Sequence, residues 1–239
     1  MDLLIKYIIA LTNFYGVVSP EIVLAVYNQQ NEHQVIEEDV QKYLLNPAEK
    51  LTAFGVVSKG GLFIQQSLFI GDDTLIRVIN EKNDKPYYIP EKTELKSYLD
   101  PNYIEKNEYY DRLYQYLRKQ LINISDDLLE EICEKFVFGV KDEVLNFGFI
   151  IRQLRSMGIF LEDCTNFQKI VELVADLGSN VRLWENNGFT RKELFENEIS
   201  ILLHHEVYEV NKETKVSSRL GDQQLKNGEK VRKLDDYRH

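Results

Sequence analysis

The residues best suited to chemistry are His204, His205 and Glu206, together with the chain's two cysteines, Cys133 and Cys164. Neighbouring histidines on a helix project about 100° apart, so one helix could not bring both onto a single metal ion. The cysteines lack the close pairing of a zinc ribbon, and phosphate-binding glycine loops and common hydrolase motifs are absent from the sequence. We therefore expect a non-enzymatic protein with no catalytic residue, cofactor or metal. An enzyme using dispersed carboxylates or the two histidines is the least supported alternative.

A second candidate is the stretch 180–190, NVRLWENNGFT, which holds the only Trp of the chain. Asn180, Arg182, Trp184 and Glu185 together could form a surface that binds a partner. The structural alternative is that Trp184 packs a corner between two helices, as large aromatic side chains near helix ends usually do. Both interpretations stay open at this point.

Basic residues could meet an anionic partner in two places. Lys59 precedes a Gly-Gly pair inside a predicted hairpin, where it could contact phosphate. Residues 211–239 carry eight Lys and Arg against five Asp and Glu, a net charge of +3, and have few large apolar side chains. We predict a basic, disordered tail there that orders only against a partner. Its candidate contact residues are Arg219, Lys230, Arg232 and Lys233.

The elements that must position these residues begin with three predicted helices and a hairpin. Apolar spacing indicates a helix over 2–15 that ends at Gly16 and a second from Pro20 to about Asn28. A third begins near Glu37 and either stops at or before Pro47 or continues after a kink to Phe54. Residues 56–64 read as two strands around Gly60 and Gly61. Three short helices followed by a hairpin predict a winged-helix-like domain over 1–84.

Helical spacing continues after an extended, proline-containing connector and predicts an all-α bundle over 85–210. One helix is expected to open at Asp142 and to include Val144. Another begins near Phe167 and either ends at Gly178 or runs on through Trp184. Residues 190–193, TRKE, form a capping box that opens the last helix of the bundle. The fold class is therefore mainly α.

The predicted third helix opens with Glu37, Glu38 and Asp39. In a winged helix that reads DNA, the corresponding residues face base edges and phosphates. Three carboxylates there would repel the polyanion. We therefore expect this domain to contact protein, and keep DNA or RNA binding through the wing or the basic tail as the alternative.

Composition limits the other classes of protein to which the chain could belong. Apolar residues make up 44% and charged residues 28% of the 239-residue chain, and the net charge of −10 speaks against broad nucleic-acid binding. No stretch approaches the roughly 20 apolar residues of a membrane span. Two cysteines make no disulfide framework, and no secretory signal is seen. We expect a bacterial-type, cytoplasmic protein that does not contact a membrane.

Three segments carry a family resemblance. Residues 180–190, 85–90 (KPYYIP) and 98–100 (YLD) are similar to segments of uncharacterised Firmicutes proteins that end in a SEC-C metal-binding motif. The likeness is patchy over about 85–195, and it implies the architecture only. The Cys-x-Cys…Cys/His motif is missing, since residues 212–239 contain no cysteine. Zinc is therefore not carried over. We expect a regulatory or protein-interaction protein whose main partner is another protein.

Overall fold

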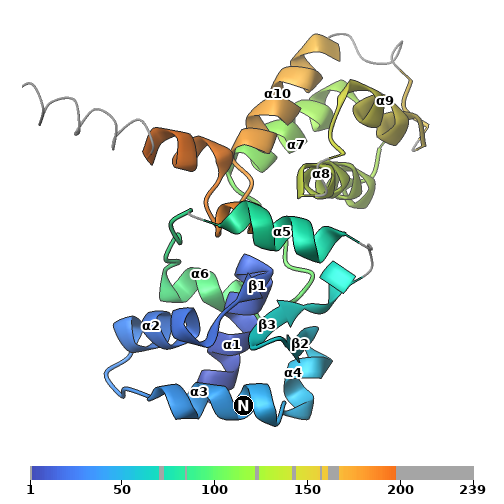
Figure 1. Cartoon of the computed structure of the whole chain (residues 1–239). Helices are drawn as coiled ribbons and strands as arrows, with labels where there is room; N and C mark the ends of the chain where they lie inside the picture. The colour runs from blue at the N-terminus through green and yellow to red at the C-terminus, as the bar shows by residue number, and fades with distance from the viewer. Residues whose placement is uncertain are drawn as a thin grey trace, which may run out of the picture. The chain divides into compact units, whose positions relative to one another are not determined.

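The computed structural model describes residues 2–69, 73–83, 85–121, 124–141, 144–156, 158–160 and 167–197. Met1–Glu193 form one compact unit, and a second unit begins at Leu194. The described chain is mainly helical with a small three-stranded antiparallel sheet, so the prediction of a mainly α protein is confirmed (Figure 1). The predicted domain boundaries near residues 84 and 210 stay predictions.

The first part of the compact unit combines helices with the sheet. Its elements in chain order are α1 (Leu3–Tyr15), β1 (Val17–Val18), α2 (Pro20–Gln30), α3 (Glu37–Leu45), α4 (Glu49–Ala53), β2 (Val56–Lys59), β3 (Leu62–Gln65) and the 3-10 helix η1 (Gln66–Phe69). The strands lie in the order β1-β3-β2. Val57 pairs with Ile64 across the hairpin, and Val17 pairs with Ile64 on its other side. Strand β1 was not predicted.

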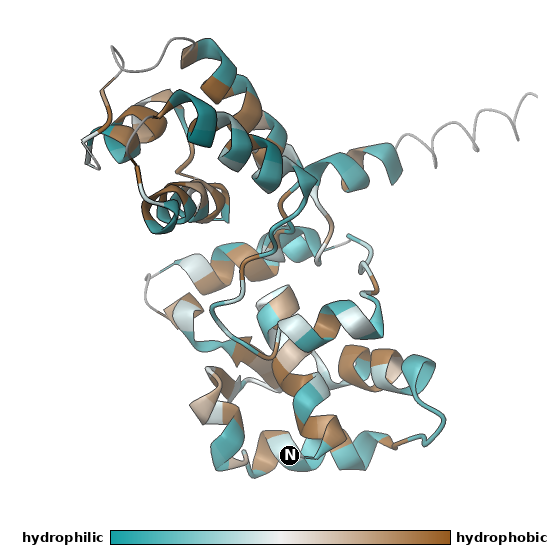
Figure 2. Ribbon diagram, turned by 180° about the vertical axis from the view of Figure 1, so that it is seen from behind, coloured by the Kyte–Doolittle hydropathy of each residue, from teal (hydrophilic) through white to brown (hydrophobic). Residues whose placement is uncertain are grey.

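Helix α1 is the centre of this part. Asp2 begins it by accepting a hydrogen bond from the backbone N–H of Leu4 at 3.1 Å, and Gly16, at φ 74°, ends it as predicted. Nearly every residue between them is buried. A helix that is apolar on all sides must be covered on all sides. In several other helices, hydrophobic and hydrophilic residues alternate along the ribbon (Figure 2).

The second part of the unit is helical. Its elements are α5 (Thr74–Lys82), α6 (Lys92–Ser97), α7 (Glu108–Gln120), α8 (Asp126–Lys141), α9 (Phe147–Ser156), α10 (Phe167–Ser179) and the 3-10 helix η3 (Trp184–Asn186). Helices α7, α8, α9 and α10 share one hydrophobic cluster centred on Leu113, Phe136 and Val174. Helix α6 instead packs on α1, through Leu95 and Tyr98.

Two predicted helix boundaries are wrong. Helix α9 begins at Phe147, after Asn146 accepts a hydrogen bond from the N–H of Phe149 at 2.9 Å, so Val144 lies outside it. Asp142 itself is outside the described residues. Gly178 lies within α10, whose last residue is Ser179, and Trp184 belongs to η3 instead of a longer helix.

The turn after η3 agrees with the sequence. Asn187 and Gly188 have φ angles of 49° and 83°, the left-handed region that Asn and Gly tolerate. Thr190 and Glu193 form the predicted capping box, each accepting a hydrogen bond from the backbone N–H of the other, at 3.0 and 3.1 Å. Residues 191–197 are helical.

Across the described ranges, no helix combines the length and the apolar character that a membrane span requires.

Candidate functional site: a lysine-rimmed groove between α1 and α6

Arg182 joins three acidic side chains. It lies 2.8 Å from Glu94, 3.1 Å from Glu193 and 3.6 Å from Glu105, and its guanidinium stacks 3.7 Å from the ring centre of Tyr88. Burial lowers the pKa of Arg182, but the three carboxylates outweigh it and leave that pKa raised. Burial raises the pKa of Glu105 more than Arg182 lowers it. The cavity beside this cluster has about 10 Å³, room for about one water molecule.

The other predicted contact residues of this stretch are also engaged within the chain. Asn180 donates to the carbonyl of Asp176 at 2.8 Å, and Trp184 donates its indole N–H to the carbonyl of Asn13 at 3.0 Å. Glu185 is 5% exposed. The stretch therefore ties the chain together, and binding of a partner through it stays a prediction.

A buried lysine fixes the same junction. Lys82 donates to the carbonyls of Tyr15 at 2.7 Å and Trp184 at 3.3 Å, and its Nζ lies over the rings of Tyr15 and Tyr87. Burial lowers its pKa to about 7, although the charge of Glu185 opposes the change. Such a pKa suits a nucleophile. The side chain, however, is almost fully buried and hydrogen-bonded to two carbonyls, so we assign it a structural role.

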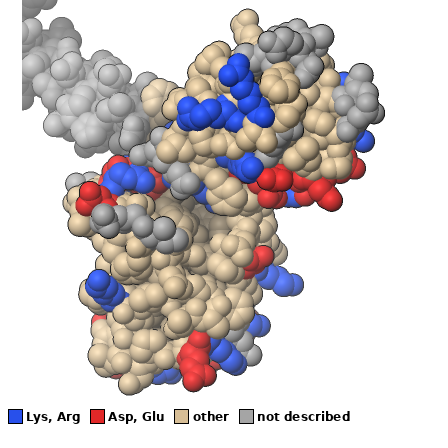
Figure 3. Space-filling model, turned by 90° about the vertical axis from the view of Figure 1, so that its right-hand side faces the viewer, with Lys and Arg blue, Asp and Glu red and all other residues tan. Residues whose placement is uncertain are grey.

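The basic candidates are less enclosed. Lys59 is exposed at the end of β2, with its Nζ 5.3 Å from the ring centre of Phe69. The tail candidates lie outside the described residues: Arg219, Lys230, Arg232 and Lys233. So do His204, His205 and Glu206. On the face drawn in Figure 3, the Lys and Arg side chains form separate small groups and no continuous band among the residues shown.

Among the residues that the structure describes, no group of three or more His, Cys, Asp or Glu side chains is arranged so that it could hold a metal ion. Cys133 is buried in the α7–α10 cluster, and burial raises the pKa of its thiol to about 12. A thiol in that state is a poor nucleophile at neutral pH.

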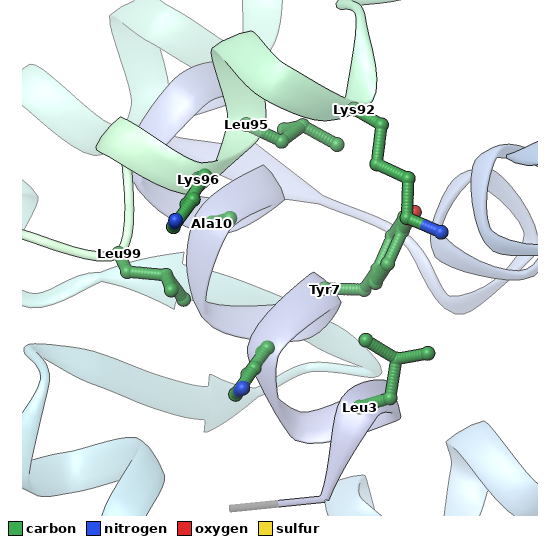
Figure 4. Close-up of a pocket in the computed structure, with 8 residues that line it drawn as sticks. Leu3, Tyr7, Ala10, Lys92, Leu95, Lys96 and Leu99 are labelled. Carbon is green, nitrogen blue, oxygen red and sulfur yellow. The ribbon is translucent and has the colours of Figure 1, made fainter.

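An open groove lies between α1 and α6, with a volume of about 230 Å³ (Figure 4). Its apolar lining comes from Leu3, Tyr7 and Ala10 on one wall and Leu95 and Leu99 on the other. On α1 the three residues follow the spacing i, i+4, i+7 of one helical face. Leu95 lies on α6, and Leu99 lies in the turn just after its last residue, Ser97. The groove is thus an apolar strip between one face of α1 and the C-terminal part of α6 with the turn that follows.

Three lysines rim this strip: Lys6 on α1, and Lys92 and Lys96 on α6. Lys92 donates to the side-chain oxygen of Asn31 at 2.7 Å, a neutral partner. Within the described chain, no carboxylate lies within ion-pair distance of any of the three. Positive charge therefore surrounds an apolar floor on a chain whose net charge is −10.

Sequence reasoning missed this site. Lys6 interrupts an otherwise apolar helical segment, and Lys92 and Lys96 share the i, i+4 spacing of one helix face. Those were the available signals. What the sequence could not supply is that residues 3–10 and 92–99 form opposite walls.

Comparisons with protein-family models, with curated proteins and with solved structures gave no match to this chain. The site must therefore be interpreted from its own geometry.

Proposed function

We propose that this chain is a non-enzymatic, cytoplasmic protein-interaction protein, and that the groove between α1 and α6 is where its partner binds. The observation that carries the proposal is an open groove whose apolar lining comes from Leu3, Tyr7, Ala10, Leu95 and Leu99. Leu3 is 41% exposed at its edge, Leu99 is half-buried, and Tyr7, Ala10 and Leu95 are buried beneath it. Grooves that take an amphipathic helix combine a continuous apolar floor with a polar rim. The groove's small volume, about 230 Å³, is below the range usual for sites of drug-sized ligands.

We further infer that residues 1–84 form a winged-helix-like domain. The support is the element order α1-β1-α2-α3, then α4, then the hairpin β2-β3, with β1 added beside β3. In such a domain α3 would be the helix presented to a partner.

The charges of α3 favour a protein partner over DNA. Glu37 and Glu38 are exposed in its first turn, while Lys42, its basic residue, lies 3.4 Å from Asp39. A helix that approaches phosphates needs uncompensated positive charge. Nucleic-acid binding through the wing, at Lys59, remains the second candidate because of the element order alone. Binding to duplex or single strands with a steep salt dependence would support it.

Site-specific photo-crosslinking in the native host tests the groove directly. A photoreactive amino acid replaces Leu99 at the groove edge, and a control replaces the exposed Gln115 on α7. We expect one protein to be crosslinked through the groove position only. The identified partner, purified, should then bind the full chain in solution.

A pair of matched substitutions completes the test. Leu3→Asp puts a charge on the groove floor, and Leu45→Asp puts the same charge on α3; both leucines are exposed, by 41% and 79%. Binding of the identified partner should fall at least about tenfold in the first variant and stay unchanged in the second. Crosslinking that yields no protein, or a partner sensitive only to Leu45→Asp, would reject the groove.

A further inference from the structure

We propose that the groove's occupant is an acidic amphipathic helix of a partner protein. This inference rests on the proposed function, and it adds the chemistry of the partner. The apolar side chains of such a helix would lie on the strip, and its carboxylates would meet the lysine rim.

The shape of the strip fits a helix. Leu3, Tyr7 and Ala10 repeat along α1 at helical spacing, with Leu95 and Leu99 facing them (Figure 4). A helix laid along this groove presents its own residues at i, i+3 or i+4, and i+7. Tyr7 is held in place by its hydroxyl, which donates to Gln30 at 2.9 Å, so the floor is formed before binding. A preformed floor reduces the entropy lost on association.

The lysine side chains around the groove favour an acidic helix as its occupant. Lys6 stands on one wall and Lys92 and Lys96 on the other, so an occupant is flanked by ammonium groups from both sides. Neither Lys6 nor Lys96 has a carboxylate within ion-pair distance among the described residues. Glu and Asp side chains beside the apolar row of the partner would supply those partners. A helix with Lys or Arg at those positions would be repelled by the ammonium groups of the groove. Charges at the rim of an interface therefore act chiefly on the choice of partner.

The test uses three peptides of about 18 residues with the same leucines at helical spacing. They differ only in the residues that flank the leucines: Glu in one, Gln in the second and Lys in the third. Fluorescence anisotropy measures binding to the full-length chain at about 50 mM salt, where charge is weakly screened. We expect the Glu peptide to bind at least about tenfold more tightly than the Gln peptide, the Lys peptide to bind most weakly, and the differences to shrink as salt rises.

A charge-reversal pair localises the effect. The double variant Lys6→Glu and Lys96→Glu should reverse the preference, so that the Lys peptide binds best. The control double variant, Lys50→Glu and Lys119→Glu, changes two exposed lysines outside the groove and should keep the original order. Thermal unfolding followed by circular dichroism confirms that both variants fold.

Each other result overturns the inference. Equal binding of the three peptides, or an unchanged preference after charge reversal, rejects the acidic partner, while a crosslinked protein at Leu99 would still leave the protein-interaction role standing. Displacement of the Glu peptide by free decanoate at equal affinity would make the groove a small-ligand site. No binding by any peptide, together with no crosslinked protein, rejects both proposals.

Discussion

Trp184 donates its indole N–H to the backbone carbonyl of Asn13 over 3.0 Å, although 171 positions separate the two residues. The same ring covers Gly16, where an added Cβ would come within 2.6 Å of the indole. The junction between α1 and η3 is therefore both hydrogen-bonded and closely packed.

Replacing the indole should show how much this junction contributes to the free energy of unfolding. Trp184→Phe keeps an aromatic ring but leaves the Asn13 carbonyl without its donor, so we expect the free energy of unfolding to fall by about 1–2 kcal/mol. Urea unfolding followed by circular dichroism reports it. Phe195→Ala, at a ring that is 63% exposed, serves as control and should cost less than about 0.5 kcal/mol. Equal losses in the two variants would contradict the junction's role.

Alanine substitutions at Gly188 and Gly60 distinguish the cost of steric crowding from the cost of backbone strain. Both have positive φ angles, 83° and 61°, but a Cβ on Gly188 would overlap Phe14, whereas a Cβ on Gly60 would meet nothing within 4 Å. We expect Gly60→Ala to cost about 1–2 kcal/mol, from strain alone. Gly188→Ala should cost about 1–3 kcal/mol more, as overpacking does. Similar unfolding midpoints for the two variants would disprove this difference.

Arg182 should stabilise the fold by neutralising the three carboxylates that surround it. Arg182→Met leaves Glu94, Glu105 and Glu193 facing one another, so we expect a loss of roughly 3 kcal/mol at pH 7. The loss should shrink as the pH falls toward about 4.5, because burial raises the pKa of Glu105 and its protonation removes one of the three repelling charges.

The control for that variant is Arg112→Met. Arg112 pairs with Glu108 at 2.7 Å, but both side chains are more than half exposed. An exposed i, i+4 pair contributes only about 0.5 kcal/mol. A comparable loss in both variants, or a loss that does not change with pH, would show that Arg182 does not act by neutralising its three neighbours.

Lys82 should make stability depend on pH. Its pKa is about 7 in the folded chain and 10.5 without burial, so between these values the unfolded chain holds a proton that the folded chain has released. Stability therefore rises with pH, by up to about 1.4 kcal/mol per unit. Urea unfolding between about pH 7.5 and 8.5 stays below the range where the phenols of Tyr15 and Tyr87 and the thiol of Cys133 lose most of their protons in either state.

Two variants identify the source of that slope. Lys82→Met should remove it, whereas Lys119→Met, at an exposed position on α7, should leave it as in the parent chain. A slope that persists without Lys82 would assign the proton to another group.

Cys133 should be inert while the chain is folded. Its thiol is buried, with a pKa of about 12. In a Cys164→Ser background, which removes the other thiol, Ellman's reagent at about pH 8 should react only after guanidinium is added. Labelling as fast as that of a free thiol would mean that the α7–α10 cluster opens readily.

Local signals in the sequence were sufficient for many elements. Gly16 ends α1, the Gly60-Gly61 turn joins β2 to β3, and Thr190 caps the last described helix, because each signal depends on residues a few positions apart. Strand β1 has only two residues, too few for a periodic pattern, and exists through its pairing with β3.

The misread features depend on tertiary contacts. The sequence allows a helix stop at Gly178, but this residue lies inside α10, where an added Cβ would stand 3.4 Å from Leu145 and Val140. This position needs a residue without a side chain, because Leu145 and Val140 approach its backbone closely. The groove was missed for a similar reason, since its two walls come from segments that local patterns treat separately.

The bond between Asn13 and Trp184 also has a consequence for synthesis on the ribosome. Helix α1 leaves the exit tunnel long before η3, so the surface that Trp184 covers stays bare while the intervening residues are translated. Trp184 must then pack against α1 late, after that helix has already formed. Nascent chains stalled before residue 184 would expose the uncovered surface of α1 to chaperones.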